Sequence, residues 1–137
     1  MVVAVDHLTL PVRDYAASKP FYEWALRPLG LVLLLDWPDG RKAWFGVEGR
    51  PSSLWLCESR AAGSLEVTLG AEDPEAVDAF HAAALSAGAR TQWEPGARPE
   101  FNRDYYAARV VDPDGNSIEA VYRGAVAASE IRHSAAA

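Results

Sequence analysis

An internal repeat constrains the fold of this chain more than any other feature of its sequence. A shift of 59 positions, which places Glu66 on His7, brings seven identical pairs together within a twenty-residue window. The pairs are Thr9 and Thr68, Leu10 and Leu69, Asp14 and Asp73, Ala17 and Ala76, Phe21 and Phe80, Ala25 and Ala84, and Leu26 and Leu85. Self-similarity at a fixed offset is typical of a duplicated structural unit. We therefore expect two copies of one module.

Each copy predicts a strand followed by a helix. The second helix has a strong start signal from Asp73 to Glu75, because Asp can cap free amides, Pro suits the first helical position and Glu faces the positive end of the dipole. Gly88 is placed to end it at about residue 87. The first helix contains Pro20, which is disfavoured deep inside a helix, so its expected start is near Ser18. The apolar face of each helix should pack on a sheet.

Three strands are expected after each helix, separated by breaks with turn chemistry such as the Pro-Asp-Gly runs at 38–40 and 113–115. The expected strands cover 31–36, 42–47 and 53–58 in the first copy, and 89–93, 105–111 and 117–122 in the second. Between the expected strands 89–93 and 105–111 lies a loop from Glu94 to Asp104, rich in Gly, Pro and Arg, of a length that is often functional.

The elements together predict an α+β fold of two βαβββ modules. The modules cover about 3–58 and 64–123, within one domain over 1–123. The Ala-rich tail, 124–137, is expected to be frayed or to contact a second copy of the chain.

Composition narrows the classes of partner and location. The chain has 137 residues, half of them apolar, which suffices for one core. The net charge is −6 and Lys and Arg are not clustered, so nucleic acid is not an expected partner. No apolar run approaches the roughly 20 residues of a membrane helix, and the apolar start is too short for a signal-peptide core. Cys57 has no second cysteine to pair with, which favours a reducing cytoplasm.

Two stretches carry a resemblance to a known family. The opening at 6–14 (DHLTLPVRD), followed by Phe21-Tyr22 and Leu29-Gly30, and the close at 105–108 (YYAA) and 112–119 (DPDGNSIE) resemble the vicinal oxygen chelate superfamily of glyoxalases, bleomycin-resistance proteins and extradiol dioxygenases. The resemblance implies a curved mixed sheet that encloses a cup. It also implies a homodimer, in some relatives with modules exchanged between chains.

The same resemblance nominates metal ligands on the first and last strands of each module. Carried over to this sequence, the ligands are His7, Glu66 and Glu119, while the fourth position holds Trp55, which cannot bind a metal. One imidazole and two carboxylates suit a divalent ion such as Mn, Fe or Mg, and the His also allows Zn or Ni. Three ligands leave open positions through which the ion could polarise a bound substrate. The first hypothesis is therefore a metal-dependent lyase, isomerase or dioxygenase acting on a small oxygen-bearing metabolite.

Other residues have alternative interpretations. Glu119 could act as a catalytic general base, or it could be neutralised by a positive partner instead of a metal. His7 could be a hydrogen-bonded histidine, and the tyrosines could be core residues. The helical equivalents Tyr22 and His81 are expected on outer surfaces. The candidate substrate-binding residues are Trp55, Thr9, Thr68, Tyr105, Tyr106, Arg98 and Arg109.

A second hypothesis belongs to a different class of protein. Trp55 offers a flat apolar wall that suits a ring-bearing ligand, and the acidic balance of the chain favours a cation. The chain would then be a metal-free protein that binds an aromatic or cationic drug, as the bleomycin-resistance branch of the family does.

Overall fold

The computed structural model describes residues 5–50 and 53–124, and within these it contains two copies of the same order of elements. The first module comprises β1 (His7–Val12), α1 (Tyr15–Ala25), β2 (Val32–Trp37), β3 (Lys42–Gly46) and β4 (Ser53–Glu58). The second comprises β5 (Glu66–Gly70), α2 (Pro74–Ser86), β6 (Arg90–Ala97), β7 (Tyr106–Val111) and β8 (Ser117–Tyr122). Short 3₁₀ turns, η1 (Arg27–Leu29) and η2 (Pro38–Gly40), flank β2.

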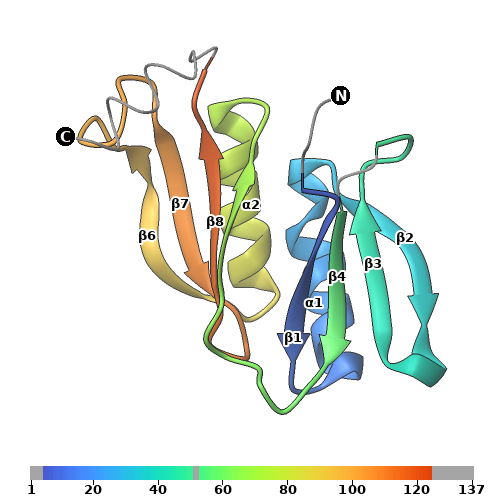
Figure 1. Cartoon of the computed structure of the whole chain (residues 1–137). Helices are drawn as coiled ribbons and strands as arrows, with labels where there is room; N and C mark the ends of the chain where they lie inside the picture. The colour runs from blue at the N-terminus through green and yellow to red at the C-terminus, as the bar shows by residue number, and fades with distance from the viewer. Residues whose placement is uncertain (1–4, 51–52, 125–137) are drawn as a thin grey trace.

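The two sheets have the same topology. Their strand orders are β1-β4-β3-β2 and β5-β8-β7-β6. In each sheet the first and last strands of the module pair in parallel, and the other pairs are antiparallel. The two sheets lie side by side, each with its helix behind it (Figure 1). The predicted α+β fold of two βαβββ modules is thereby confirmed.

The first helix begins earlier than the sequence predicts. It starts at Tyr15, because the Asp14 carboxylate caps the backbone N–H of Ala17 at 3.2 Å. Pro20 therefore lies inside the helix, not in its first turn. Pro20 has no backbone N–H to donate to the carbonyl of Ala16. Both residues are exposed, so water can reach that carbonyl. The second helix has the predicted cap, in which Asp73 accepts from Ala76 N–H at 2.7 Å.

The second strand of the second module, β6, is longer than expected. β6 runs to Ala97, into the segment predicted to be loop, with irregular pairing to β7 near Trp93 and Gly96. β6 is an edge strand of its sheet, so Pro95 can lie in it without removing a ladder hydrogen bond from a second neighbour. The expected long loop shortens accordingly. Residues 125–137, most of the predicted tail, lie outside the described residues.

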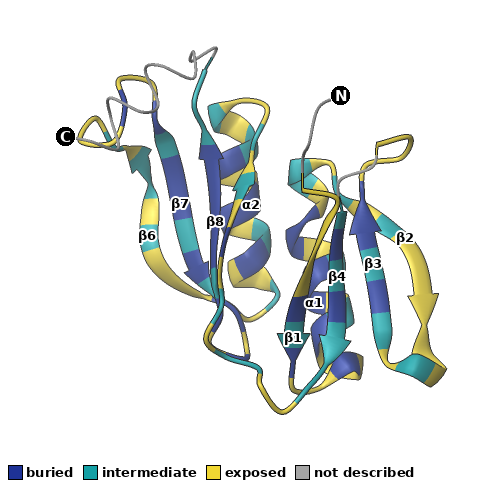
Figure 2. Ribbon diagram, in the orientation of Figure 1, coloured by how far each residue is buried: buried dark blue, intermediate teal, exposed yellow. Residues whose placement is uncertain are grey.

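The apolar core lies between the sheets and the helices. Buried residues that face the helix include Leu10 on β1, Leu56 on β4 and Ile118 on β8, whereas the edge strands β2 and β6 contain no buried residue. Alternation along the strand turns the intervening side chains to the opposite face. On β4 burial follows this two-sided pattern, whereas residues 118–121 of β8 are all buried (Figure 2). None of the described helices is long and apolar enough to cross a membrane.

Tyr22 and His81 are buried, which corrects the expectation that they lie on outer surfaces. They are 1% and 8% exposed, because α1 and α2 pack against each other as well as against the sheets. His81 Nε2 lies 2.9 Å from Thr91 Oγ1 on β6. The Tyr22 hydroxyl donates to the Asp112 carboxylate.

The turn between β7 and β8 fixes the second module to the first. In this turn Asp114 accepts from Arg13 N–H at 3.2 Å and from the Ser18 hydroxyl at 3.4 Å. Asp112, also in the turn, accepts from Tyr22 of α1. Both carboxylates are buried, so these polar contacts compensate for lost hydration and hold the modules in one orientation.

Candidate ligand-binding site

The face of each sheet that is turned away from its helix carries the polar and aromatic candidates. We call this face the open face. The strand registers bring three open-face residues into one row on each sheet. The row on the first sheet is Thr9, Trp55 and Trp44, and we call it the aromatic row. The row on the second sheet is Thr68, Glu119 and Arg109, and we call it the ionic row.

Two residues of the aromatic row, Thr9 and Trp55, line a hollow on the first sheet. The rings of Trp44 and Trp55 are stacked, with centroids 5.2 Å apart and planes 10° apart. His7 meets Trp55 edge-on at 6.4 Å. The hollow has a volume of about 240 Å³ and is lined by His7, Thr9, Lys42, Trp55 and Cys57. It is therefore a small site with one flat aromatic side.

His7 is held in place by its neighbour in the sequence. Its Nδ1 lies 2.9 Å from the Asp6 carboxylate, which orients the ring and leaves Nε2 for another partner. The Asp6 side chain is 78% exposed, so this contact adds little to stability. Its effect is to fix how the imidazole is presented at the hollow.

In the ionic row, the Glu119 carboxylate is buried and fully engaged. Glu119 is 2% exposed, and it accepts from Thr68 Oγ1 at 2.9 Å and from the Tyr105 hydroxyl at 3.2 Å. Arg109 Nη2 lies 3.5 Å away. Burial, together with the adjacent Glu119 charge and hydrogen bond, raises the pKa of Tyr105, so its hydroxyl stays protonated and donates at neutral pH. Glu119 thus has the positive partner that the sequence left as an alternative to a metal.

A second aromatic group surrounds the ionic row. The guanidinium carbons of Arg109 and Arg98 lie 4.0 and 4.8 Å from the centroid of the Trp93 ring. Phe101 stacks on Trp93 at 5.9 Å and approaches Tyr105 at 5.2 Å. Cation–π contacts of this kind are worth about 0.5–2 kcal/mol, depending on desolvation. The residues beyond β6 therefore bring aromatic and cationic groups together, as the sequence predicts for Arg98 and Tyr105.

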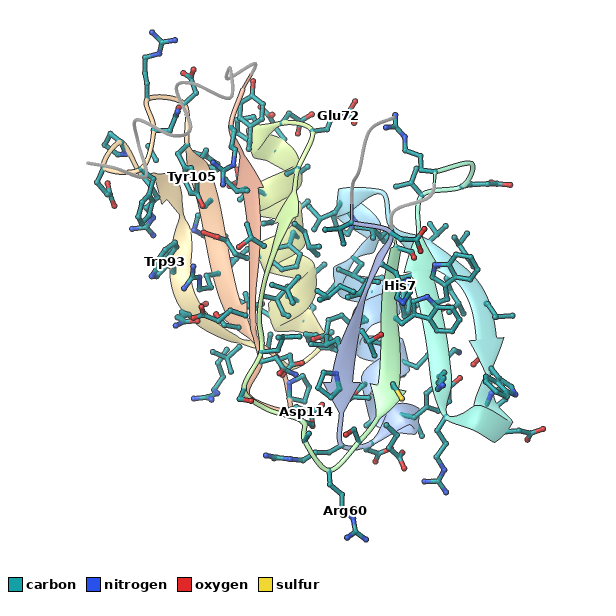
Figure 3. The ribbon with its side chains drawn as sticks, viewed as in Figure 1. His7, Arg60, Glu72, Trp93, Tyr105 and Asp114 are labelled. Carbon is teal, nitrogen blue, oxygen red and sulfur yellow. The ribbon has the colours of Figure 1, made fainter. Side chains whose placement is uncertain are left out.

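The three nominated metal ligands are not gathered within one chain. His7 belongs to the first sheet, and Glu66 and Glu119 to the second (Figure 3 labels His7, Tyr105 and Trp93 on their respective sheets). Within residues 5–50 and 53–124, no group of three His, Cys, Asp or Glu side chains is arranged to hold an ion. Arg109 also lies 3.8 Å from Glu66, which is 75% exposed. Since a guanidinium already occupies the space between the two carboxylates, the residues of one chain do not fit a metal centre.

Tyr106 lies apart from the other candidates, and its expected place at the site is corrected. Strand alternation turns it towards the helix, where its hydroxyl donates to Asp78 of α2 at 2.7 Å. It also packs against the main core. Thr9, Thr68, Trp55 and Arg109 lie on the open faces, as do the neighbouring Arg98 and Tyr105.

Sequence reasoning missed several residues of the site, namely Lys42, Trp44, Cys57, Trp93 and Phe101. Trp44 could have been found from the meander, because an antiparallel pairing of the second and third predicted strands places some residue of 42–47 opposite Trp55. Trp93 could not, since the irregular pairing of β6 changes which side chains face the sheet's open side.

Comparisons with known proteins agree with this architecture. A glyoxalase/bleomycin resistance protein from Albidiferax ferrireducens shares 28% identity over 88% of this chain and 98% of its own, with a TM-score of 0.74. An antibiotic binding protein from a Streptomyces species shares 29% identity over 90% of this chain and 98% of its own, with a TM-score of 0.66. A glyoxalase/bleomycin resistance protein from the same genus shares 30% identity over 83% and 96%, with a TM-score of 0.62.

The chain has no match among curated proteins. The family model described as Glyoxalase/Bleomycin resistance protein/Dioxygenase superfamily matches residues 4–120. The match covers both modules, in accordance with the duplicated strand order of the two sheets. This chain therefore belongs to the glyoxalase/bleomycin resistance protein/dioxygenase superfamily.

Proposed function

We propose that this protein binds a flat, ring-bearing small molecule on its open faces without a resident metal ion. The observation that carries the proposal is Trp55, which lines the hollow of the first sheet beside His7 and stacks on Trp44. Small-molecule sites are largely apolar and aromatic, with a few polar groups that orient the ligand. Trp55, which the family resemblance places where relatives carry a potential ligand to the metal, is such an aromatic group.

The surroundings of Glu119 support the metal-free alternative over the enzyme. A divalent ion at this carboxylate would have to displace the Arg109 guanidinium and compete with the hydroxyl donors of Thr68 and Tyr105. The same partners leave Glu119 poorly placed as a general base, because its lone pairs already accept hydrogen bonds. The Streptomyces relative that is described as an antibiotic binding protein supports a binding role for this chain as well.

The assembly proposed with this function is a cytoplasmic homodimer. Each chain would contribute one domain, residues 1–123, to the dimer. The open face of the first module in one chain lies opposite the open face of the second module in the other, so the aromatic row meets the Trp93 group across a closed cup. Light scattering of the purified protein tests the dimer, since a monomer at micromolar concentration would contradict it.

A direct experiment tests binding and metal content together. Protein purified without chelator is analysed for metals, and binding of the neutral planar probe 2-naphthamide is measured by calorimetry before and after chelator treatment. We expect no stoichiometric metal and unchanged affinity. Trp55→Ala should weaken binding about tenfold or more, because stacking is lost. Trp24→Ala, which alters a tryptophan on α1 that is 52% exposed, is the matched control and should bind normally.

The second candidate, a divalent-metal enzyme, is favoured by one observation. The contact of Asp6 with His7 Nδ1 is the arrangement that orients a metal-binding imidazole through its other nitrogen. A stoichiometric transition metal that is lost in His7→Ala would replace the metal-free proposal with this one.

A further inference from the structure

We infer that the ligand of the hollow on the first sheet is an anion: a planar aromatic acid whose ring lies on Trp55 and whose negatively charged oxygen is bound by Lys42. This inference rests on the proposed function, since it names the class of ligand for the same site. It differs from the cationic drug that the acidic composition of the chain suggests.

The charge of the hollow is positive although the protein is acidic. Lys42 is the one lining residue that carries a full charge at neutral pH, and none of the five lining residues is a carboxylate. At physiological salt, charges at the surface act over only roughly 8 Å. A ligand in the hollow therefore responds more to the positive charge of Lys42 than to the net charge of −6 of the whole chain.

The two carboxylates next to the hollow are directed elsewhere. Asp6 precedes His7 and is bound to its Nδ1. Glu58 follows Cys57, but its oxygens accept from Arg41 and from the backbone N–H of Tyr15. Neither carboxylate is therefore paired with Lys42, whose ammonium lies over the exposed Trp37 ring at 5.6 Å.

Unpaired donors on the open faces also call for a ligand that supplies acceptors. Trp44 Nε1, in the aromatic row, is buried and has no acceptor among the described residues. Arg98 Nε and Arg109 Nε beside Trp93 are also unpaired within the described part of the chain, but they belong to the second module and lie outside this hollow. A buried donor without a partner costs free energy, and this cost is relieved by a carboxylate, phenolate or carbonyl oxygen. A cation would bring further donors and relieve none of it.

The dimensions of the hollow set the size of the ring system. Its volume of about 240 Å³ is slightly below the range of roughly 300–1,000 Å³ typical of drug-sized ligands. Trp55 lines the hollow with a flat ring and stacks on Trp44, which does not line it. A ligand with one ring or two fused rings and an acidic substituent can stack on Trp55 and bind Lys42 at the same time.

Three probes with one ring skeleton separate the charge from the shape. Binding of 2-naphthoate, 2-naphthamide and 2-naphthylmethylammonium to the full chain is measured by calorimetry at low and at physiological salt. We expect naphthoate to bind about tenfold more tightly than the neutral amide, as for one charge-assisted hydrogen bond, and the cation most weakly. The preference should shrink as salt is added.

Substitutions of the two lysines test whether Lys42 causes the preference for naphthoate over naphthamide. Lys42→Met should reduce the affinity for naphthoate to that for naphthamide, leave the amide unchanged, and preserve the near-ultraviolet circular dichroism of the folded protein. Lys42→Arg should retain the preference. Lys19→Met removes the other lysine, which lies on α1 near Asp36, and is the control with the same change of charge.

Each outcome bears on a different claim. Equal binding of all three probes, tightest binding of the cation, or a preference that survives Lys42→Met overturns the anionic ligand while the proposed binding function stands. Failure of all three probes to bind overturns the binding function and this inference together.

Discussion

Removal of Arg109 tests whether the buried Glu119 charge is neutralised by a side chain of this protein. In Arg109→Met the methionine keeps part of the apolar contact with Trp93, while Glu119 stays buried with only the donors of Thr68 and Tyr105. Breaking a fully buried ion pair costs about 3–5 kcal/mol. Arg109 is 20% exposed and its closest contact to Glu119 is 3.5 Å, so water screens part of the interaction. We expect a loss of about 2–3 kcal/mol, including the cation–π contact.

Urea denaturation measures this loss, and a double-mutant cycle isolates the pair. With a slope of about 1.5 kcal/mol per molar urea, the midpoint of Arg109→Met should fall by roughly 1.3–2 M. In Glu119→Gln the unpaired charge is absent, so adding Arg109→Met to it should cost about 1–2 kcal/mol less than in the parent. Arg103→Met changes an arginine that is 83% exposed and should stay within about 0.5 kcal/mol of the parent.

Two results would refute the reasoning about Glu119. A cost below about 0.5 kcal/mol for Arg109→Met, equal to that of Arg103→Met, would show that the pair contributes nothing. A fall in the unfolding midpoint of the parent protein on addition of chelator would show that a bound cation, not Arg109, compensates the carboxylate.

Two further predictions concern the folded state. Tyr22→Phe removes the donor to buried Asp112 and should cost about 1–3 kcal/mol at pH 7, as measured by urea denaturation. Burial first, and then the nearby Asp112, raise the pKa of Tyr22 well above its ordinary value, so the parent should lose stability as the pH rises above about 10 and the variant should lose less. Equal alkaline losses in the two proteins would contradict this role of Tyr22. Asp73→Ala removes the cap on Ala76 N–H and should lower the free energy of unfolding by about 1 kcal/mol, while the neighbouring exposed Glu72→Ala should change it by less than about 0.5.

The parts of the fold that depend on local signals could be predicted from the sequence. The duplicated strand-helix-strand pattern predicts the α+β fold, and the cap at Asp73 is found as expected because a cap involves only residues within one turn. The start of α1 was misplaced because the capping energy of Asp14 outweighs the penalty of an exposed proline further along the helix. Both effects are local, but their relative size depends on whether Pro20 faces water, which the sequence does not state.

Contacts between distant segments could not be predicted. Tyr22 and His81 are buried because α1 packs on α2, and the packing of two helices depends on how the sheets below them are placed. The partner of Glu119 depends on the register of β7 against β8, in which a slip of one residue would turn Arg109 to the helix side. The residue types at the candidate site could thus be listed from the sequence, whereas their pairing required the register of the strands.

The equivalence of the aromatic and ionic rows has a consequence for how selectivity can change in such a protein. The β3–β4 register sets Trp44 opposite Trp55, and the equivalent β7–β8 register sets Arg109 opposite Glu119. The two modules thus carry different recognition chemistry on one backbone arrangement, and in the ionic row the buried Glu119 contributes to stability as well. A few substitutions on the open face of one module could therefore change which ligand the protein binds, without any change to the other module or to the shared backbone arrangement.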